Sequence, residues 1–164
     1  MKNLISSFFV AATMMVALVS CGTSNGLTKA EREAQVVQQV QAALDQGTYT
    51  IAVDWMRPLG GMPRHVSSTY MLKVNGDEVD SYLPYVGEAY RLPYGGGKGL
   101  NFKGKIYGYK VLKPTSNRYI IEFDVKNDED IYRYRIDMFT NGKAIIDVYA
   151  QDRDAISFDG EMVF

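Results

Sequence analysis

The sequence predicts a mainly β domain: an antiparallel meander that forms a barrel-like or half-open sheet, with one N-terminal α-helix packed on it. Short runs in which apolar and polar residues alternate recur through most of the chain, and turn-forming residues separate them. Asn–Gly pairs, which favour tight hairpins, occur at 75–76 and at 141–142. Many strands joined by short turns favour an antiparallel order over a parallel one.

A helix is expected over 29–46, because this stretch contains neither proline nor glycine. Thr28 and Glu31 have the spacing of a capping box, and Gly47 suits the position that follows a helix. The apolar residues fall on one stripe, at positions 36, 37, 40, 43 and 44. Glu33 continues that stripe one turn earlier, so we expect only the second half of the helix to pack against the sheet.

The alternation typical of a strand begins directly after Gly47. One buried face is expected to carry Tyr49, Ile51, Val53 and Trp55. Further strands are expected on both sides of the first Asn–Gly pair and then at 106–113, 118–126, 132–138 and 144–150. A short last pair of strands is expected around Gly160, at 156–158 and 162–164, which makes eight or so strands in all.

Residues 81–104, here called the tyrosine-rich segment, contain four of the twelve tyrosines and repeat Leu-Pro-Tyr twice. Each proline fixes its own φ and pushes the preceding residue towards extended geometry, so we expect an ordered loop in place of a helix or a central strand. Because tyrosine is enriched at recognition surfaces, the segment is a candidate binding surface made of Tyr82, Tyr85, Tyr90 and Tyr94. The alternative is structural: these rings plug the barrel end and hold the loop down.

The first residues predict a lipoprotein. Lys2 precedes an apolar run at 4–19 that is too short to span a bilayer, and Leu-Val-Ser-Cys at 18–21 resembles the bacterial lipobox. We therefore expect a signal peptide at 1–20, a diacylglyceryl and acyl lipid anchor on Cys21, and a tether at 21–27. The alternative is a plain secretory peptide with a coincidental cysteine. Gly22 and the lack of an acidic run in the tether favour the outer membrane, with the domain facing the periplasm.

Residues 28–164 fit a single β-rich domain with its N-terminal helix. The chain carries 18 Lys and Arg against 19 Asp and Glu without a basic block, so nucleic acid is not expected as a partner. His65 is the only histidine and Cys21 the only cysteine, which is too few for a zinc site built on these ligands.

No catalytic residue, metal site or cofactor other than the lipid anchor is predicted. No nucleophile-elbow pattern such as G-x-S-x-G occurs. The acidic turns at 128–130 and 152–154 could supply oxygens to calcium, but neither has the spacing of an EF-hand loop. Charged hairpin turns are common without any metal.

Five stretches carry a family resemblance: V-D-W-M-R-P-L-G-G at 53–61, V-N-G-D-E-V at 74–79, S-Y-L-P-Y-V-G-E-A-Y at 81–90, P-Y-G-G-G-K-G-L-N-F at 93–102 and D-R-D-A-I-S-F-D-G at 152–160. Together they resemble an uncharacterised lipoprotein family of Bacteroidetes, catalogued as Domain of Unknown Function 4251. The resemblance extends from about Ala34 onward and implies a bacterial envelope lipoprotein. It brings no activity and no catalytic residue with it.

Three classes of function stay open. A non-catalytic binding module for a small ligand or glycan is favoured by the aromatic segment, since the mouths of β-barrels are common ligand sites. A structural or assembly partner of envelope proteins is the alternative, favoured by the tether and the helix. An enzyme is disfavoured, because no nucleophile, base or metal set is visible in the sequence.

Overall fold

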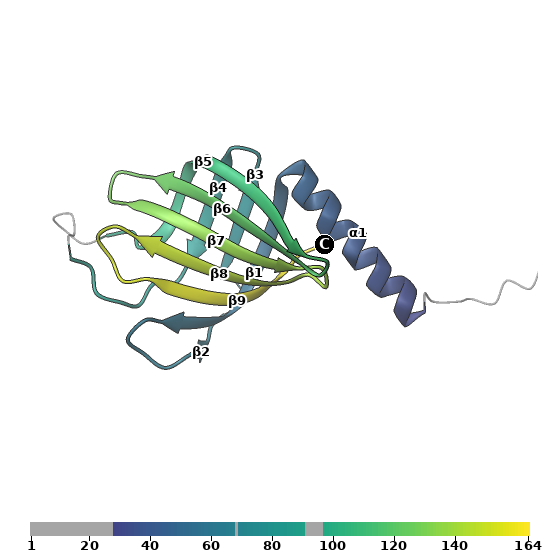
Figure 1. Ribbon diagram of the computed structural model, residues 1–164. Coiled ribbons are helices and arrows are strands. Elements are labelled where there is room, and N and C mark those ends of the chain that lie inside the picture. The colour runs from purple at the N-terminus through teal and green to yellow at the C-terminus, as the bar shows by residue number, and fades with distance from the viewer. Residues whose placement is uncertain (1–27, 68, 91–96) are drawn as a thin grey trace, which may run out of the picture.

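The computed structural model describes residues 28–67, 69–90 and 97–164, which form one helix and nine strands (Figure 1). In chain order these are α1 (Lys29–Gln46), β1 (Thr48–Pro58), β2 (Arg64–His65), β3 (Met71–Asn75), β4 (Glu78–Leu83), β5 (Leu100–Thr115), β6 (Arg118–Lys126), β7 (Ile131–Phe139), β8 (Lys143–Ala150) and β9 (Ile156–Met162).

The strands form a closed antiparallel barrel. β1 pairs with β3, and β3 to β9 then pair with one another in sequence order. Because β1 also pairs with β9, these eight strands close into a ring, while the two-residue strand β2 pairs only with β1. The predicted fold class, mainly antiparallel β with one N-terminal helix, is confirmed.

The barrel interior is a packed core. The side chains of Phe123 and Tyr134 stack with their ring centroids 5.0 Å apart, and those of Phe102 and Tyr132 stack at 4.8 Å. The Tyr134 hydroxyl donates to Ser81 Oγ at 3.0 Å. Burial raises the pKa of Tyr134, so this hydroxyl stays a proton donor. Large aliphatic side chains fill the rest: Ile51, Leu72, Leu100, Ile121, Ile136, Met138 and Ile146.

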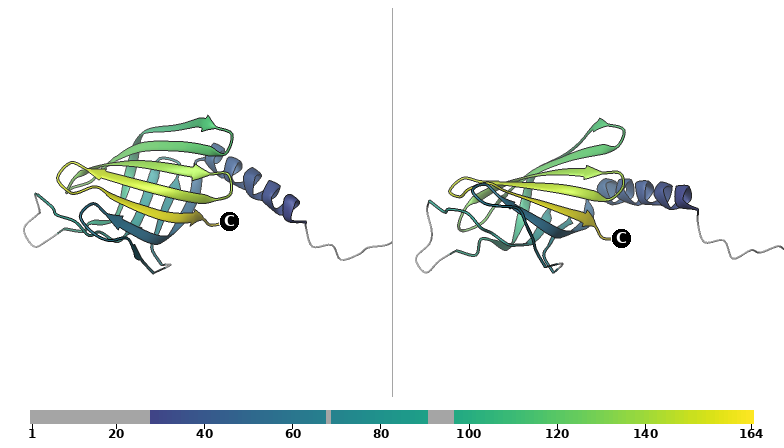
Figure 2. Two further views of the ribbon diagram at one scale, coloured as in Figure 1. Left: turned by 60° about the horizontal axis from the view of Figure 1, so that its bottom comes forward. Right: turned by 90° about the horizontal axis from the view of Figure 1, so that it is seen from below.

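The helix α1 begins and ends where the sequence predicts. Glu31 N–H donates to Thr28 Oγ1 at 3.3 Å, and Thr28 N–H donates to Glu31 Oε2 at 2.7 Å, which completes the capping box. Gly47 ends the helix in the left-handed region at φ 63°. Val40 and Leu44 are buried in the core, whereas the first half of α1 is exposed and points away from the barrel (Figures 1 and 2). Within the described residues, no helix has the length and apolar character needed to cross a membrane.

Trp55 does not lie on the buried face that the alternation predicts. The pairing of β1 with β9 shifts register between Val53 and Trp55, so β1 contains a bulge at this point. Val53 and Met56 are buried, while 42% of Trp55 is exposed. The extra residue reverses the alternation, and the expectation that Trp55 shares the face of Tyr49, Ile51 and Val53 is therefore wrong.

Two expected boundaries are also wrong. The ends of the tyrosine-rich segment, 81–83 and 100–104, belong to β4 and β5 and pair with each other inside the sheet. Both prolines lie between these ends, so they do not interrupt the pairing. In addition, β9 runs through Gly160 as one strand, because β1 covers this residue and pairs with it at Val53.

Replacement of Gly160 by alanine is expected to lower the free energy of unfolding by about 3 kcal/mol, because the backbone of β1 leaves no room for a Cβ. A Cβ built at Gly160 would overlap the carbonyl oxygen of Ala52. Urea denaturation followed by circular dichroism measures the loss.

Gly60→Ala is the matched control, because a Cβ at Gly60 meets no atom within 4 Å. It should change the free energy of unfolding by less than about 0.5 kcal/mol. Equal effects of the two substitutions would contradict the tight approach of β1 and β9.

Candidate functional site

The described residues of the loop between β4 and β5, 84–90 and 97–99, lie at the barrel end opposite α1, next to the β6–β7 and β8–β9 turns (Figures 1 and 2). Ala89 and Arg153 form an isolated antiparallel bridge, which brings the segment against the β8–β9 turn. Tyr90 N–H donates to the carbonyl oxygen of Asp152 at 2.8 Å and extends this contact. Three stretches that are distant in the sequence therefore converge at one end of the barrel.

A buried ion pair lies beneath the segment. The side chain of Arg153, which is 4% exposed, donates to Glu129 Oε2 at 2.6 Å, and its Nε lies 3.7 Å from Asp130 Oδ2. The ring of Tyr85 covers the guanidinium, with 5.7 Å between the ring centroid and Cζ. Since an unpaired buried charge is strongly destabilising, these opposite charges must stay together.

The carboxylates of the acidic turns accept hydrogen bonds from the protein backbone. Asp130 Oδ1 accepts from Gln151 N–H at 3.0 Å, and its Oδ2 accepts from Asp152 N–H at 3.2 Å. Glu129 Oε1 accepts from Lys98 N–H at 2.8 Å. In the described part of the chain, no three His, Cys, Asp or Glu side chains are placed to hold a metal ion together. The carboxylates join the two turns to the loop.

Asp154 fixes the exposed side of the segment. Its Oδ1 accepts from the Tyr90 hydroxyl at 2.6 Å, and its Oδ2 accepts from Glu88 N–H at 3.0 Å. These two hydrogen bonds hold the pKa of Asp154 below its ordinary value, the bond from Tyr90 being the larger cause. The Tyr85 hydroxyl donates to the carbonyl oxygen of Glu88 at 2.9 Å. The backbone of the loop is thus held at several points.

The four candidate tyrosines have different surroundings. Tyr90 is 67% exposed, Tyr82 is 42% exposed on the outer face of β4, and Tyr85 is half-buried. The ring of Tyr82 packs against that of Tyr70, at 5.2 Å between centroids. Tyr94 and the predicted lipidation site Cys21 lie outside the described residues. The structure brings Tyr85 and Tyr90 together around Asp154 and places Tyr82 on the neighbouring strand face.

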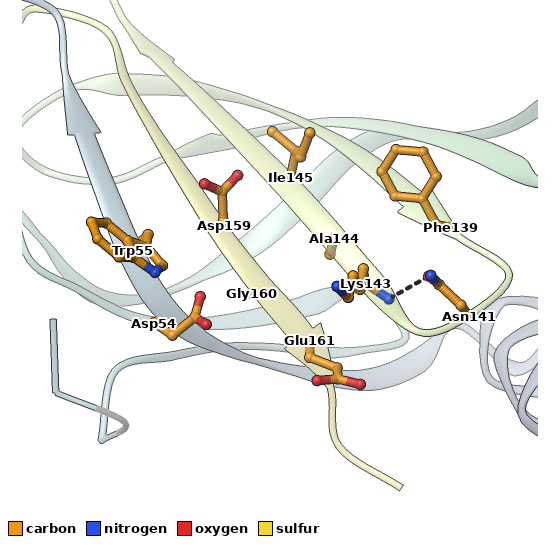
Figure 3. A pocket seen from close by; sticks show the side chains of 10 residues that line it. All are labelled: Asp54, Trp55, Phe139, Asn141, Lys143, Ala144, Ile145, Asp159, Gly160 and Glu161. Atoms are coloured by element: carbon orange, nitrogen blue, oxygen red, sulfur yellow. Dashed lines mark hydrogen bonds between the residues drawn. The ribbon is translucent and has the colours of Figure 1, made fainter. Parts of the chain in front are cut away.

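A surface hollow of about 460 Å³ lies on the outer face of β1, β8 and β9 (Figure 3). It is lined by Trp55 and Asp54 on β1, by Asp159 and Glu161 on β9, and by Lys143 on β8. Sequence reasoning missed it, because strict alternation turns Trp55 inward. Met56 is the residue that could have revealed it. This apolar side chain can join the inward-facing side chains of β1 only if the strand contains a bulge between Val53 and Trp55.

Comparison with known proteins places the chain beside one family. The family described as "Domain of unknown function (DUF4251)" matches residues 31–162. A crystal structure of a DUF4251 family protein from Bacteroides eggerthii DSM 20697 is similar, with a TM-score of 0.61 and 14% sequence identity, over 79% of this chain and 88% of that chain. At this identity the likeness shows the fold alone. No curated protein matches.

Tyr90→Phe is expected to raise the pKa of Asp154 towards its ordinary value, because it removes the hydroxyl that donates to this carboxylate. NMR titration of the Asp154 carboxyl carbon measures the change. A depressed pKa in the folded state adds stability above the unfolded pKa, and this stability is lost as the pH falls through the folded pKa. In the variant, the difference between the unfolded-state and folded-state pKa of Asp154 should therefore be smaller, and Asp154 should add less stability at neutral pH.

Tyr82→Phe is the control, because the Tyr82 hydroxyl lies on the outer face of β4 and does not contribute to the lowered pKa of Asp154. An Asp154 pKa that moves equally in both variants, or in neither, would contradict the hydrogen bond from Tyr90.

Proposed function

The chain belongs to the DUF4251 family, and from that premise we propose that it is a lipid-anchored envelope protein whose barrel is a non-catalytic binding module for a small ligand or glycan. The proposed binding surface is the tyrosine-rich segment, with Tyr82, Tyr85, Tyr90 and Tyr94. The proposed anchor is a diacylglyceryl and acyl lipid on Cys21, on the outer membrane and facing the periplasm.

The binding proposal rests mainly on Tyr90, whose side chain is exposed to solvent while hydrogen bonds hold it in place. Its ring is 67% exposed although its hydroxyl and its backbone N–H are both engaged, with Asp154 and Asp152. A ring that is already fixed loses little conformational entropy when a ligand stacks on it. Tyrosine combines an apolar face with a polar edge, which suits sugars and flat polar ligands.

The interior of the barrel supports an external site. Tyr132, Tyr134 and Phe123 are fully buried among the inward side chains and occupy the space that a ligand would need. The tyrosine-rich segment lies at the end opposite α1 (Figure 1). With the tether attached before α1, this surface would face away from the membrane that carries the lipid.

A second candidate function, a structural or assembly partner of envelope proteins, is favoured by α1. The exposed first half of this helix projects from the barrel (Figure 1). A hollow of about 410 Å³ lies between Val36 and Val37 of α1 and the residues Thr140 and Asn141. Its lining includes both valines, of which Val37 is 38% exposed.

Cys21→Ala is expected to abolish the lipid anchor, because the thioether to diacylglycerol requires this sulfur. Mass spectrometry of the N-terminus and detergent phase partitioning of cell extracts measure the change: the native chain should carry lipid and enter the detergent phase, and the variant should do neither. A native chain without N-terminal lipid that still fractionates with the membrane would overturn the anchor proposal.

Tyr90→Ala and Tyr82→Ala should each lower the free energy of unfolding by about 1 kcal/mol or less, since both rings are partly in solvent and lose only the hydrogen bond to Asp154 and the contact with Tyr70, respectively. Tyr85→Ala should cost about 2 kcal/mol, because it uncovers Arg153 and removes a half-buried ring. Thermal melts measure stability, and a glycan array probed with the full chain measures binding; Tyr90→Ala should remove from the array pattern the glycans that the segment holds.

Tyr107→Ala is the control for the array, because Tyr107 is 57% exposed on β5 outside the segment. An array pattern that Tyr90→Ala leaves unchanged, or large stability losses at both Tyr82 and Tyr90, would leave the segment as a structural plug and contradict the binding proposal.

A further inference from the structure

The bulge in β1 exposes the only tryptophan of the chain. Tryptophan is the largest apolar side chain, and its exposure to solvent gives up much of the stabilisation that burial would bring. Bulges occur often beside functional sites, where they re-aim a side chain. Trp55 stands next to His65 of β2, edge to face at 5.8 Å between centroids.

The hollow beside Trp55 offers hydrogen-bond acceptors. Asp54 and Glu161 are exposed carboxylates, and within the described residues neither side chain has a hydrogen bond or ion pair. Asp159 lies two residues before Glu161 on β9, on the other side of Gly160 (Figure 3). Its Oδ1 is 2.7 Å from Arg57 Nη2. Two carboxylates are thus free to accept hydrogen bonds from a ligand.

The same hollow also offers donors. The Lys143 side chain lines it and, among the described residues, forms no ion pair. Asn141 Oδ1 accepts from the Lys143 backbone N–H at 3.1 Å, which leaves the Asn141 amide NH₂ group to donate (Figure 3). Donors and acceptors therefore surround one exposed aromatic face.

We propose that this hollow binds a neutral carbohydrate. A sugar ring would lie with its C–H face on the indole of Trp55, while its hydroxyls donate to Asp54 and Glu161 and accept from Lys143 and Asn141. The hollow, at about 460 Å³, is within the range of about 300–1,000 Å³ that is usual for small-molecule sites. The site is separate from the tyrosine-rich segment and does not rest on its role.

The charges of the hollow disfavour an anionic ligand. Three carboxylates, those of Asp54, Asp159 and Glu161, repel an anion such as phosphate more than Arg57 and Lys143 attract it. An organic cation is the competing occupant, and the test below therefore includes one. A polyhydroxylated neutral ring needs both donors and acceptors, and it tolerates this mixture of charges.

Because Trp55 is the only tryptophan, fluorescence excited selectively in tryptophan reports on the surroundings of Trp55. The full chain is titrated with three neutral oligosaccharides, maltohexaose, cellohexaose and N-acetylchitohexaose, and with spermidine as a cationic probe. We expect a saturable change with at least one oligosaccharide. Glu161→Ala should weaken that binding about tenfold, the effect of losing one charge-assisted hydrogen bond.

Glu78→Ala is the matched control: this carboxylate is also exposed, at the start of β4 and outside the hollow. It should leave the affinity unchanged, and both variants should melt like the native chain. The proposal is overturned if no oligosaccharide changes the fluorescence, if only spermidine does, or if Glu161→Ala and Glu78→Ala bind alike.

Tyr90→Ala separates this site from the tyrosine-rich segment. It should leave the fluorescence titration unchanged even where it removes glycans from the array pattern. If Tyr90→Ala abolishes the fluorescence change, the ligand sits on the segment, and the Trp55 site is overturned while the binding function of the segment stands. If Glu161→Ala alone weakens binding, the Trp55 site stands without the segment.

Discussion

Antiparallel hydrogen bonding between β1 and β9 joins the first long strand of the sheet to the last, from Ile51 opposite Met162 to Pro58 opposite Ile156. Closure leaves these two strands without a free edge along this seam. It also fixes which side chains point inward around the ring, because successive residues of a strand face opposite sides. The seam depends on Gly160, where β1 leaves no room for a side chain. A core filled by aromatic and aliphatic side chains follows.

At the end of the barrel opposite α1, a buried ion pair network joins stretches of chain that are distant in the sequence. Arg153, Glu129 and Asp130 are all nearly excluded from solvent, and each carboxylate also accepts backbone N–H groups from a neighbouring stretch of chain. Buried charges are tolerated when opposite charges lie beside them, as the two carboxylates do here, even though Arg153 Nε has no hydrogen bond of its own. The network therefore joins two acidic turns and the described residues of the loop, 84–90 and 97–99, into one ordered surface. This order lets the ring of Tyr90 remain in solvent while its hydroxyl is held.

Trp55 and Tyr90 are exposed for related reasons, since in both cases the backbone is fixed by other interactions. A bulge opposite β9 sets the direction of Trp55, and the contacts of Asp152 and Asp154 set that of Tyr90. Elsewhere the outer face carries cross-strand ion pairs, such as Arg133 with Asp124 and Arg135 with Glu122. Such pairs suit a solvated surface and add little stability. Exposed aromatic rings beside uncommitted polar groups are therefore the features of this surface that suit recognition.

The sequence by itself determined the features that depend on near neighbours: the capped ends of α1, the alternation of β6 to β8 and the antiparallel order of the strands. The capping box, for example, needs only Thr28 and Glu31, three residues apart. Tertiary structure decided the closure of the barrel, the direction of Trp55, the pairing of β4 with β5 inside the tyrosine-rich segment and the burial of Arg153. These features depend on partners far along the chain, as in the ion pair between Arg57 and Asp159, which are separated by 102 positions. The periodicity of a short stretch does not indicate which distant strand will pair with it. A bulge or a buried ion pair therefore cannot be predicted until the strand pairing is known.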